Sequence, residues 1–121
     1  MVKSTSVRRT VPDLLDGLAI LATDLDIRTT EVEQLIGIHG GLWPIAAARL
    51  ELWWPSDEQF ERITSLSEVC ASAASLMGIE ARLWMRRYNP GLGCSPVCFM
   101  LRGMDALITL RNILRQEQGR C

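Results

Sequence analysis

Signals that start and stop helices are closely spaced along this sequence. Ser56 with Gln59, and Thr30 with Glu33, have the capping-box pattern, in which two side chains satisfy free amides at the start of a helix. Gly37 stands where the helix opened by Thr30 would end. The alternation of apolar and polar residues that indicates a half-buried strand is nearly absent. A chain with this pattern is predicted to fold as an all-α protein.

We expect seven helices connected by short loops. A first amphipathic helix over 13–25 carries apolar residues at spacings of three and four. The longest helix, over 57–77, is expected to end at Gly78, and its small residues at 71–74 would let another helix approach closely. The other helices are expected over 30–36, 45–54, 80–87, 97–101 and 104–117.

The length of 121 residues accommodates one compact domain, or two small helical lobes that share a core. A hydrophobic content of 48% with 22% charged residues is that of a folded globular protein. The apolar segment that follows the basic N-terminus is interrupted by Asp13 and Asp16. We therefore expect no secretion signal, no membrane span and a cytoplasmic location.

Residues suited to catalysis or metal binding are sparse. The chain has four cysteines without a Cys-x-x-Cys pair, and His39 is its one histidine. A zinc site would need Cys94, Cys98 and two further ligands, which the sequence does not place nearby. The glycines at 91–93 follow a helix instead of a strand, so they do not fit a dinucleotide site. We expect no enzymatic activity, no cofactor, no metal site and free thiols.

The total charge of −1 conceals two unequal halves. Residues 1–78 contain six basic and eleven acidic residues, whereas residues 79–121 contain seven basic and three acidic ones. An acidic surface repels a phosphate backbone. The distribution therefore favours a protein over a nucleic acid as the main partner.

Residues 13–55 have the layout of a helix-turn-helix module, with a scaffold helix, a second helix and a third element in the recognition position. The third element offers one side chain, Arg49, of the kind that reads base edges. Arg8 and Arg9 lie in a segment, 1–12, that we expect to be a flexible tail, with insertion into a minor groove as the alternative. Whether DNA is bound at all stays open at this point.

Trp53 and Trp54 are adjacent in the sequence. Neighbours on a helix point about 100° apart, so both cannot face one core. Either one of them reaches a partner surface, or the two fill both sides of a short buried helix, and the sequence favours neither arrangement.

The C-terminal third carries the most recognisable pattern. It reads Ala81-Arg82-Leu83-Trp84-Met85, then Tyr88-Asn89-Pro90-Gly91-Leu92-Gly93, Ser95-Pro96 and Leu101-Arg102-Gly103, followed by a closing helix that ends in Gly119. This pattern resembles the toxin-binding domain of the Xre/MbcA/ParS antitoxins, and the preceding helix-turn-helix layout and long helix are similar to the same family. This chain departs from the family pattern at one position. Cys94 follows Gly93, whereas the family has a second glycine there.

The resemblance implies a degenerate Xre-like helix-turn-helix lobe over 13–55, then a long connecting helix and a small toxin-binding lobe over 56–121. It implies a homodimeric antitoxin that neutralises a NAD-consuming RES-type toxin by direct binding, with weak autoregulatory DNA binding as a possible addition. The toxin-facing residues that it implies are Trp84, Asn89, Pro90, Leu92, Gly93, Pro96, Leu101, Gly103, Gly119, Arg120 and Cys121. Arg86, Arg87, Arg102 and Arg120 are further surface candidates because of their charge.

Other interpretations remain open. Helical spacing favours core packing over partner contact for four large side chains, namely Trp84, Leu92, Leu101 and Leu114. Asn89 is expected to brace its loop. In place of an antitoxin, the chain would be a helix-turn-helix transcriptional regulator, or an acidic inhibitor or adaptor encoded by a mobile element that has lost DNA binding.

Overall fold

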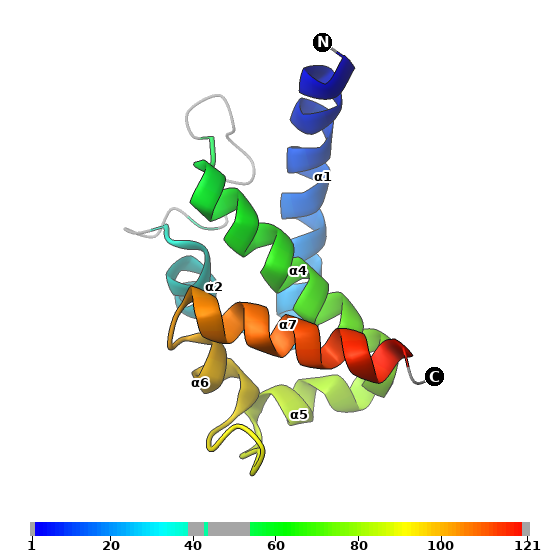
Figure 1. Cartoon of the computed structure of the whole chain (residues 1–121), viewed down its shortest axis with the longest axis vertical. Coiled ribbons are helices and arrows are strands. Elements are labelled where there is room, and N and C mark those ends of the chain that lie inside the picture. The colour runs from blue at the N-terminus through cyan, green and yellow to red at the C-terminus, as the bar shows by residue number, and fades with distance from the viewer. Residues whose placement is uncertain (1, 39–42, 44–53, 120–121) are drawn as a thin grey trace.

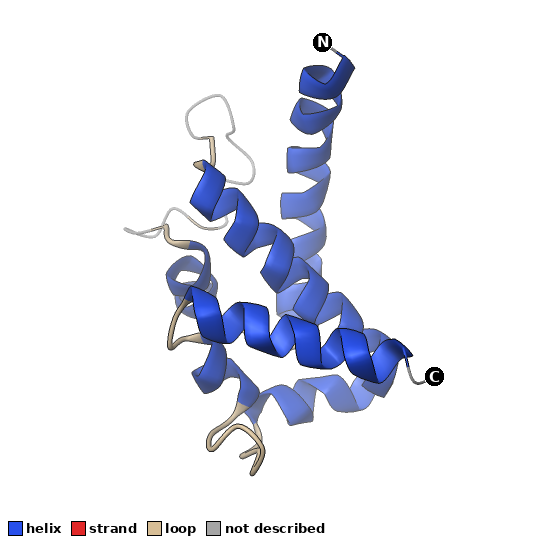
Figure 2. Ribbon diagram, viewed as in Figure 1, coloured by secondary structure: helices blue, strands red, loops and turns tan. Residues whose placement is uncertain are grey.

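The computed structural model describes residues 2–38, 43 and 54–119, with side chains from residue 13 onward. Within these ranges the chain is helical and has no strand (Figures 1 and 2). The elements are α1 (Val2–Asp24), α2 (Thr29–Ile36), α4 (Asp57–Met77), the 3-10 turn η1 (Gly78–Glu80), α5 (Ala81–Arg86), α6 (Pro96–Met100) and α7 (Met104–Gly119). The all-α prediction is confirmed for this part of the chain, and no described helix is long and apolar enough to cross a membrane.

The capping box predicted at Ser56 starts α4. The Ser56 hydroxyl accepts a hydrogen bond from the amide of Gln59 at 3.1 Å, and the Gln59 side chain accepts one from the amide of Ser56 at 2.9 Å. The side-chain amide of Gln59 also donates to the carbonyl of Gly37 at 2.9 Å. Gly37 ends α2 with a φ of 81°, a left-handed conformation that favours glycine. One glutamine therefore ties the end of α2 to the start of α4.

The start of α1 differs from our prediction. The helix begins at Val2 and runs through Arg8, Arg9 and Pro12, whereas we expected residues 1–12 to form a flexible tail and the helix to start near residue 13. Proline suits a first helical turn, which is why it indicated a helix start. A helix can also pass through a proline at the cost of one backbone hydrogen bond, here the one to the carbonyl of Arg8. In Figure 1 the first turns of α1 rise above the other helices.

The start of α2 also differs. We expected Thr30 and Glu33 to cap this helix, but the N-cap is Arg28, whose amide donates to the carboxylate of Glu31 at 2.9 Å. Glu33 accepts instead from the backbone amide of Trp43 at 3.1 Å. The acidic residue at the third helical position is therefore Glu31 and not Glu33. Arginine is not among the residues that N-caps prefer, so capping preferences do not indicate this earlier start.

A single buried cluster joins all the α-helices of the described chain. α4 is central, because it packs on α7 and α1 most extensively and also on α2 and α5. Figure 1 shows it crossing both α1 and α7. Burial of each large apolar side chain contributes about 1.5–3 kcal/mol before entropy is counted. The largest fully buried side chains are Leu15, Leu18, Val32, Ile36, Ile63, Leu66, Val69, Met85, Met100, Leu107 and Leu110.

Several predictions for the first half lie outside the described residues. They are the helix over 45–54, the roles of His39, Arg49 and Trp53, and thus the third element of the helix-turn-helix layout. Trp43 is buried, and Trp54 is 44% exposed. Buried residues from 13–55 and from 56–121 belong to the same cluster, so the division into two lobes stays a prediction.

Candidate functional site

The loop between α5 and α6 is built around Asn89. The Asn89 carbonyl accepts hydrogen bonds from the amides of Leu92 and Gly93, at 3.0 and 2.9 Å, and its side-chain oxygen accepts one from the amide of Gly91 at 2.9 Å. Its own amide donates to the carbonyl of Cys94 at 3.1 Å, which closes the loop as an isolated bridge. Asn89 thus braces the loop, as expected from the sequence.

We call the pattern from Ala81 to Gly103 the motif. Two of its glycines have backbone conformations that favour glycine. Gly93 completes the Asn89 loop with a φ of 76°, and Gly103 joins α6 to α7 with a φ of 147°. Between them, Ser95 caps α6 by accepting from the amide of Cys98 at 3.3 Å, and Pro96 occupies the first turn and is buried. Gly93, Gly103 and the Ser95-Pro96 pair therefore have structural roles that do not depend on which partner the motif binds.

A hollow of about 420 Å³ lies where this motif meets the ends of α4 and α7. Trp84 and Asn89 from the motif line it together with Ile113 and Glu117 of α7. Leu76, Met77 and Leu114 complete it. We call these seven residues the Trp84 hollow. It brings together two segments that the sequence pattern singled out separately, the Trp-bearing helix and the closing helix.

Several side chains at and beside the Asn89 loop are exposed. Tyr88 is 64% exposed, and Arg87 and Pro90 are exposed beside it. Ile113 is 39% exposed, because it lies next to Leu114 but outside the buried stripe of α7, which contains Leu107, Leu110 and Leu114. Tyr88 and Ile113 were not among the predicted site residues. The exposure of Ile113 could have been predicted from the sequence, since this residue lies one position away from the apolar stripe of its helix.

Arg86 does not extend into solvent as a surface candidate would. Its guanidinium donates to the Glu31 carboxylate at 2.8 and 2.5 Å, and to the backbone carbonyl of Asp26 at 2.5 Å. Partial burial raises the pKa of Glu31, but hydrogen bonds from Arg86 and the Arg28 amide outweigh it, so that pKa lies below its ordinary value. The hydrogen bond to Glu31 raises the pKa of Arg86. Arg86 therefore fixes α5 against α2.

Other arginines of the C-terminal third also meet the acidic first half. Arg115 of α7 forms an ion pair with Glu68 of α4, and Arg111 donates to the Ser65 hydroxyl at 3.1 Å. Arg82 lies 4.0 Å from the carboxylate of Asp26. The charge asymmetry seen in the sequence is thus partly neutralised within the molecule, which weakens its value as a sign of an external partner.

The remaining predicted site residues have mixed environments. Arg102 is exposed, lies 5.4 Å from the centre of the Phe99 ring and donates to the Cys94 sulfur at 3.4 Å. Trp84, Leu92 and Leu101 are half-buried against the core, and Leu114 is buried. Gly93 is exposed and Gly103 half-buried. Arg120 and Cys121 lie outside the described residues.

The described cysteines are free thiols. Cys70 is buried in α4, and burial raises its pKa to about 12. Cys94 is half-buried and Cys98 is exposed. Among the residues that the structure describes, no group of three or more histidine, cysteine or acidic side chains is arranged to hold a metal ion.

Comparison with protein-family models finds no family that matches this chain, and comparison with curated proteins finds no match either.

Proposed function

We propose that this protein is an antitoxin that binds and neutralises a NAD-consuming RES-type toxin, and that the toxin docks over the Trp84 hollow. This proposal depends on one observation, which is that residues of the motif and of α7 line the same hollow at the surface. Trp84 and Asn89 belong to the pattern that resembles the toxin-binding domain, and they line the same hollow as Ile113 of α7.

The shape and chemistry of the hollow support a protein partner. A volume of about 420 Å³ accommodates one large apolar side chain. Protein interfaces typically gain most of their affinity from a few such anchors in desolvated pockets, surrounded by contacts that contribute little energy but exclude water. Here five large apolar side chains and two polar residues line the pocket, namely Leu76, Met77, Trp84, Ile113 and Leu114 with Asn89 and Glu117.

The rigidity of the loop also supports a docking surface. Four hydrogen bonds of Asn89 hold residues 89–94 in one conformation, and the exposed Tyr88 and Pro90 flank this residue. A surface that is already ordered loses less conformational entropy on binding. Arg87 adds an exposed positive charge next to Tyr88, suited to an acidic group of the partner.

The proposal is tested by identifying a RES-type protein encoded beside this chain, co-expressing the two proteins and measuring growth and cellular NAD. The wild-type chain is expected to restore both. Ile113→Arg places a charge in the exposed wall of the Trp84 hollow, so it is expected to lose protection. Ile20→Arg makes the same change at a 63%-exposed position of α1 and should protect like wild type.

Two outcomes would reject the proposal. The first is a wild-type chain that fails to protect when both proteins are present at comparable levels. The second is equal protection by Ile113→Arg and wild type, which would mean that the toxin, if bound, does not use this hollow. Circular dichroism of the two purified variants separates loss of binding from loss of fold.

A further inference from the structure

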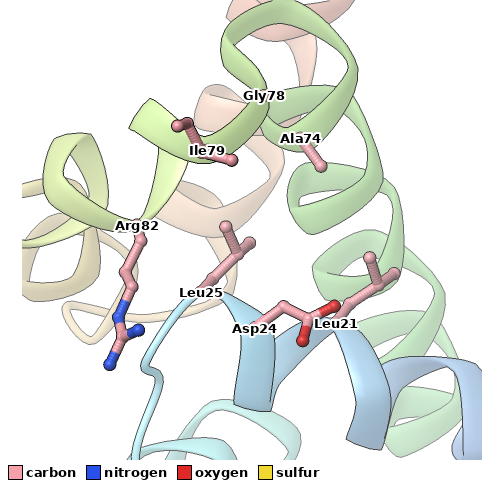
Figure 3. A pocket seen from close by; sticks show the side chains of 7 residues that line it. All are labelled: Leu21, Asp24, Leu25, Ala74, Gly78, Ile79 and Arg82. Carbon is pink, nitrogen blue, oxygen red and sulfur yellow. The ribbon is translucent and has the colours of Figure 1, made fainter.

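A second hollow lies between the end of α1 and the turn that follows α4 (Figure 3). Its volume is about 490 Å³, and it shares no residue with the Trp84 hollow. We call it the α1–η1 hollow. The residues that line it come from α1, α4, η1 and α5, and they are Leu21, Asp24, Leu25, Ala74, Gly78, Ile79 and Arg82.

Apolar side chains one helical turn apart stand on both sides of this hollow. Leu21 and Leu25 are four residues apart in α1, and Ile79 of η1 is followed four residues later by Leu83 of α5. Ile79 is 92% exposed and Leu83 is 55% exposed. Single exposed apolar residues are ordinary, but two on one helical face beside an apolar hollow indicate a surface that another molecule covers.

Asp24 occupies an unfavourable position on α1. It is the last residue of this helix, where the helix dipole is negative and a carboxylate is disfavoured. The last turn of α1 contains no basic residue, and no ion pair joins Asp24 to a basic side chain of the described residues. A cation beside Asp24 would therefore be attracted by both the carboxylate and the end of the helix.

The charges at the edge of the hollow are mainly negative. Two further exposed acidic residues stand close by in the sequence, Asp26 after Asp24 and Glu80 after Ile79. Arg82 is the one basic residue among those that the structure places in the lining, and it lies 4.0 Å from the carboxylate of Asp26. Its charge is thus directed to an acid of its own chain, and the edge as a whole suits a basic partner.

We propose that the α1–η1 hollow docks a basic amphipathic helix of a second protein. Apolar side chains one turn apart on that helix enter the hollow, and a lysine or arginine beside them pairs with Asp24. Recognition of a helix in a groove combines apolar anchors at this spacing with charges beside them. The proposal does not depend on the antitoxin function, because the toxin is proposed to dock over the Trp84 hollow.

The first test measures fluorescence anisotropy of a labelled synthetic peptide mixed with the purified full chain. The peptide is about 15 residues long, near the minimum length for an isolated helix in water, with leucines on one helical face and lysines on the other. We expect binding with a micromolar dissociation constant. A second peptide, in which glutamate replaces every lysine, is expected to bind at least about tenfold more weakly.

The second test compares four variants with the lysine peptide. Ala74→Leu fills the hollow without changing the charge and is expected to weaken binding at least about tenfold, whereas Ala71→Leu, at an exposed position of α4 outside the hollow, should bind like wild type. Asp24→Lys is also expected to weaken binding at least about tenfold. Glu61→Lys makes the same change of charge about 20 Å along α4 from Ala74 and should bind like wild type.

The third test is the melting temperature of Asp24→Lys without peptide. A basic residue at the end of α1 favours the helix, so we expect the melting temperature to rise by about 2 °C or more. A more stable protein that binds the peptide less well would identify Asp24 as a docking residue. A lower melting temperature would instead show that Asp24 already has a favourable contact within its own chain, which contradicts the proposal.

Three further results would overturn the proposal. They are equal binding of the lysine and glutamate peptides, unchanged affinity of Ala74→Leu or Asp24→Lys for the lysine peptide, and self-association of wild type in sedimentation equilibrium that Ala74→Leu abolishes. The last result would make a second copy of this chain the occupant of the hollow.

Discussion

The guanidinium of Arg86 holds the carboxylate of Glu31 with two hydrogen bonds, at 2.8 and 2.5 Å, across 55 positions of sequence. The pair joins the start of α2 to the end of α5, and both side chains are less than one-third exposed. The same carboxylate caps α2 through the amide of Arg28. One contact therefore sets the helix start in the first half and fixes the motif-bearing helix in the second.

Arg86→Ala is expected to lower the free energy of unfolding by about 2 kcal/mol, because Glu31 would keep its partial burial without its charged donor. Arg87→Ala removes the neighbouring arginine, which is exposed. This variant should change the free energy of unfolding by less than about 0.5 kcal/mol. Urea denaturation measures both. A double-mutant cycle with Glu31→Gln should give a coupling energy of about 1 kcal/mol or more, and additive effects would show that the pair is not coupled.

The Glu31 pair should also make stability depend on pH. The folded pKa of Glu31 lies below its ordinary value of 4.5, so the unfolded chain binds the proton more tightly. The stabilisation is complete above a pH of about 4.5 and is lost as the pH falls through the folded pKa. Glu31→Gln is therefore expected to lose less stability than wild type between pH 7 and pH 3. Parallel pH profiles for the two proteins would contradict this.

Ser56→Ala is expected to destabilise the protein by about 1 kcal/mol, since the change removes the acceptor for the Gln59 amide at the start of α4. Ser75→Ala makes the same substitution at an exposed position inside α4, where alanine is a good helix former, and should cost nothing. Thermal unfolding of the two variants compares them. Equal effects would mean that the cap contributes no stability.

The cysteines should differ in reactivity. Thiolates react with iodoacetamide, and Cys70 is buried with a pKa of about 12, so it should stay unlabelled in the folded protein. Cys98 is exposed and should be labelled readily. Peptide mapping by mass spectrometry distinguishes the two sites, and unfolding in urea should make Cys70 reactive. Rapid labelling of Cys70 in the native protein would show that α4 is not packed as described.

Sequence patterns predicted the helices best where the signal was local. The capping box at Ser56, the stop at Gly78 and the Ser95-Pro96 start of α6 all depend on neighbours within a few residues, and the structure has each of them. The bracing role of Asn89 was also predictable, because an Asn-Pro-Gly sequence favours side-chain bonding to nearby amides.

Predictions were wrong or incomplete where distant contacts decide. The sequence predicted that Thr30 and Glu33 cap α2, whereas the cap is formed by Arg28 and Glu31, and Glu31 is held by Arg86, which no local pattern reveals. The same pairing removed Arg86 from the exposed surface. The Trp84 hollow requires α4, α5 and α7 to converge, so the part that Ile113 plays in it follows from packing.

Isothermal titration of the purified RES-type protein into this chain measures the proposed interaction directly. Wild type and Ile20→Arg are expected to bind with the same micromolar or tighter dissociation constant, and Ile113→Arg to bind at least about tenfold more weakly. Absence of any complex with wild type at micromolar concentration, or undiminished binding by Ile113→Arg, would contradict docking over the Trp84 hollow.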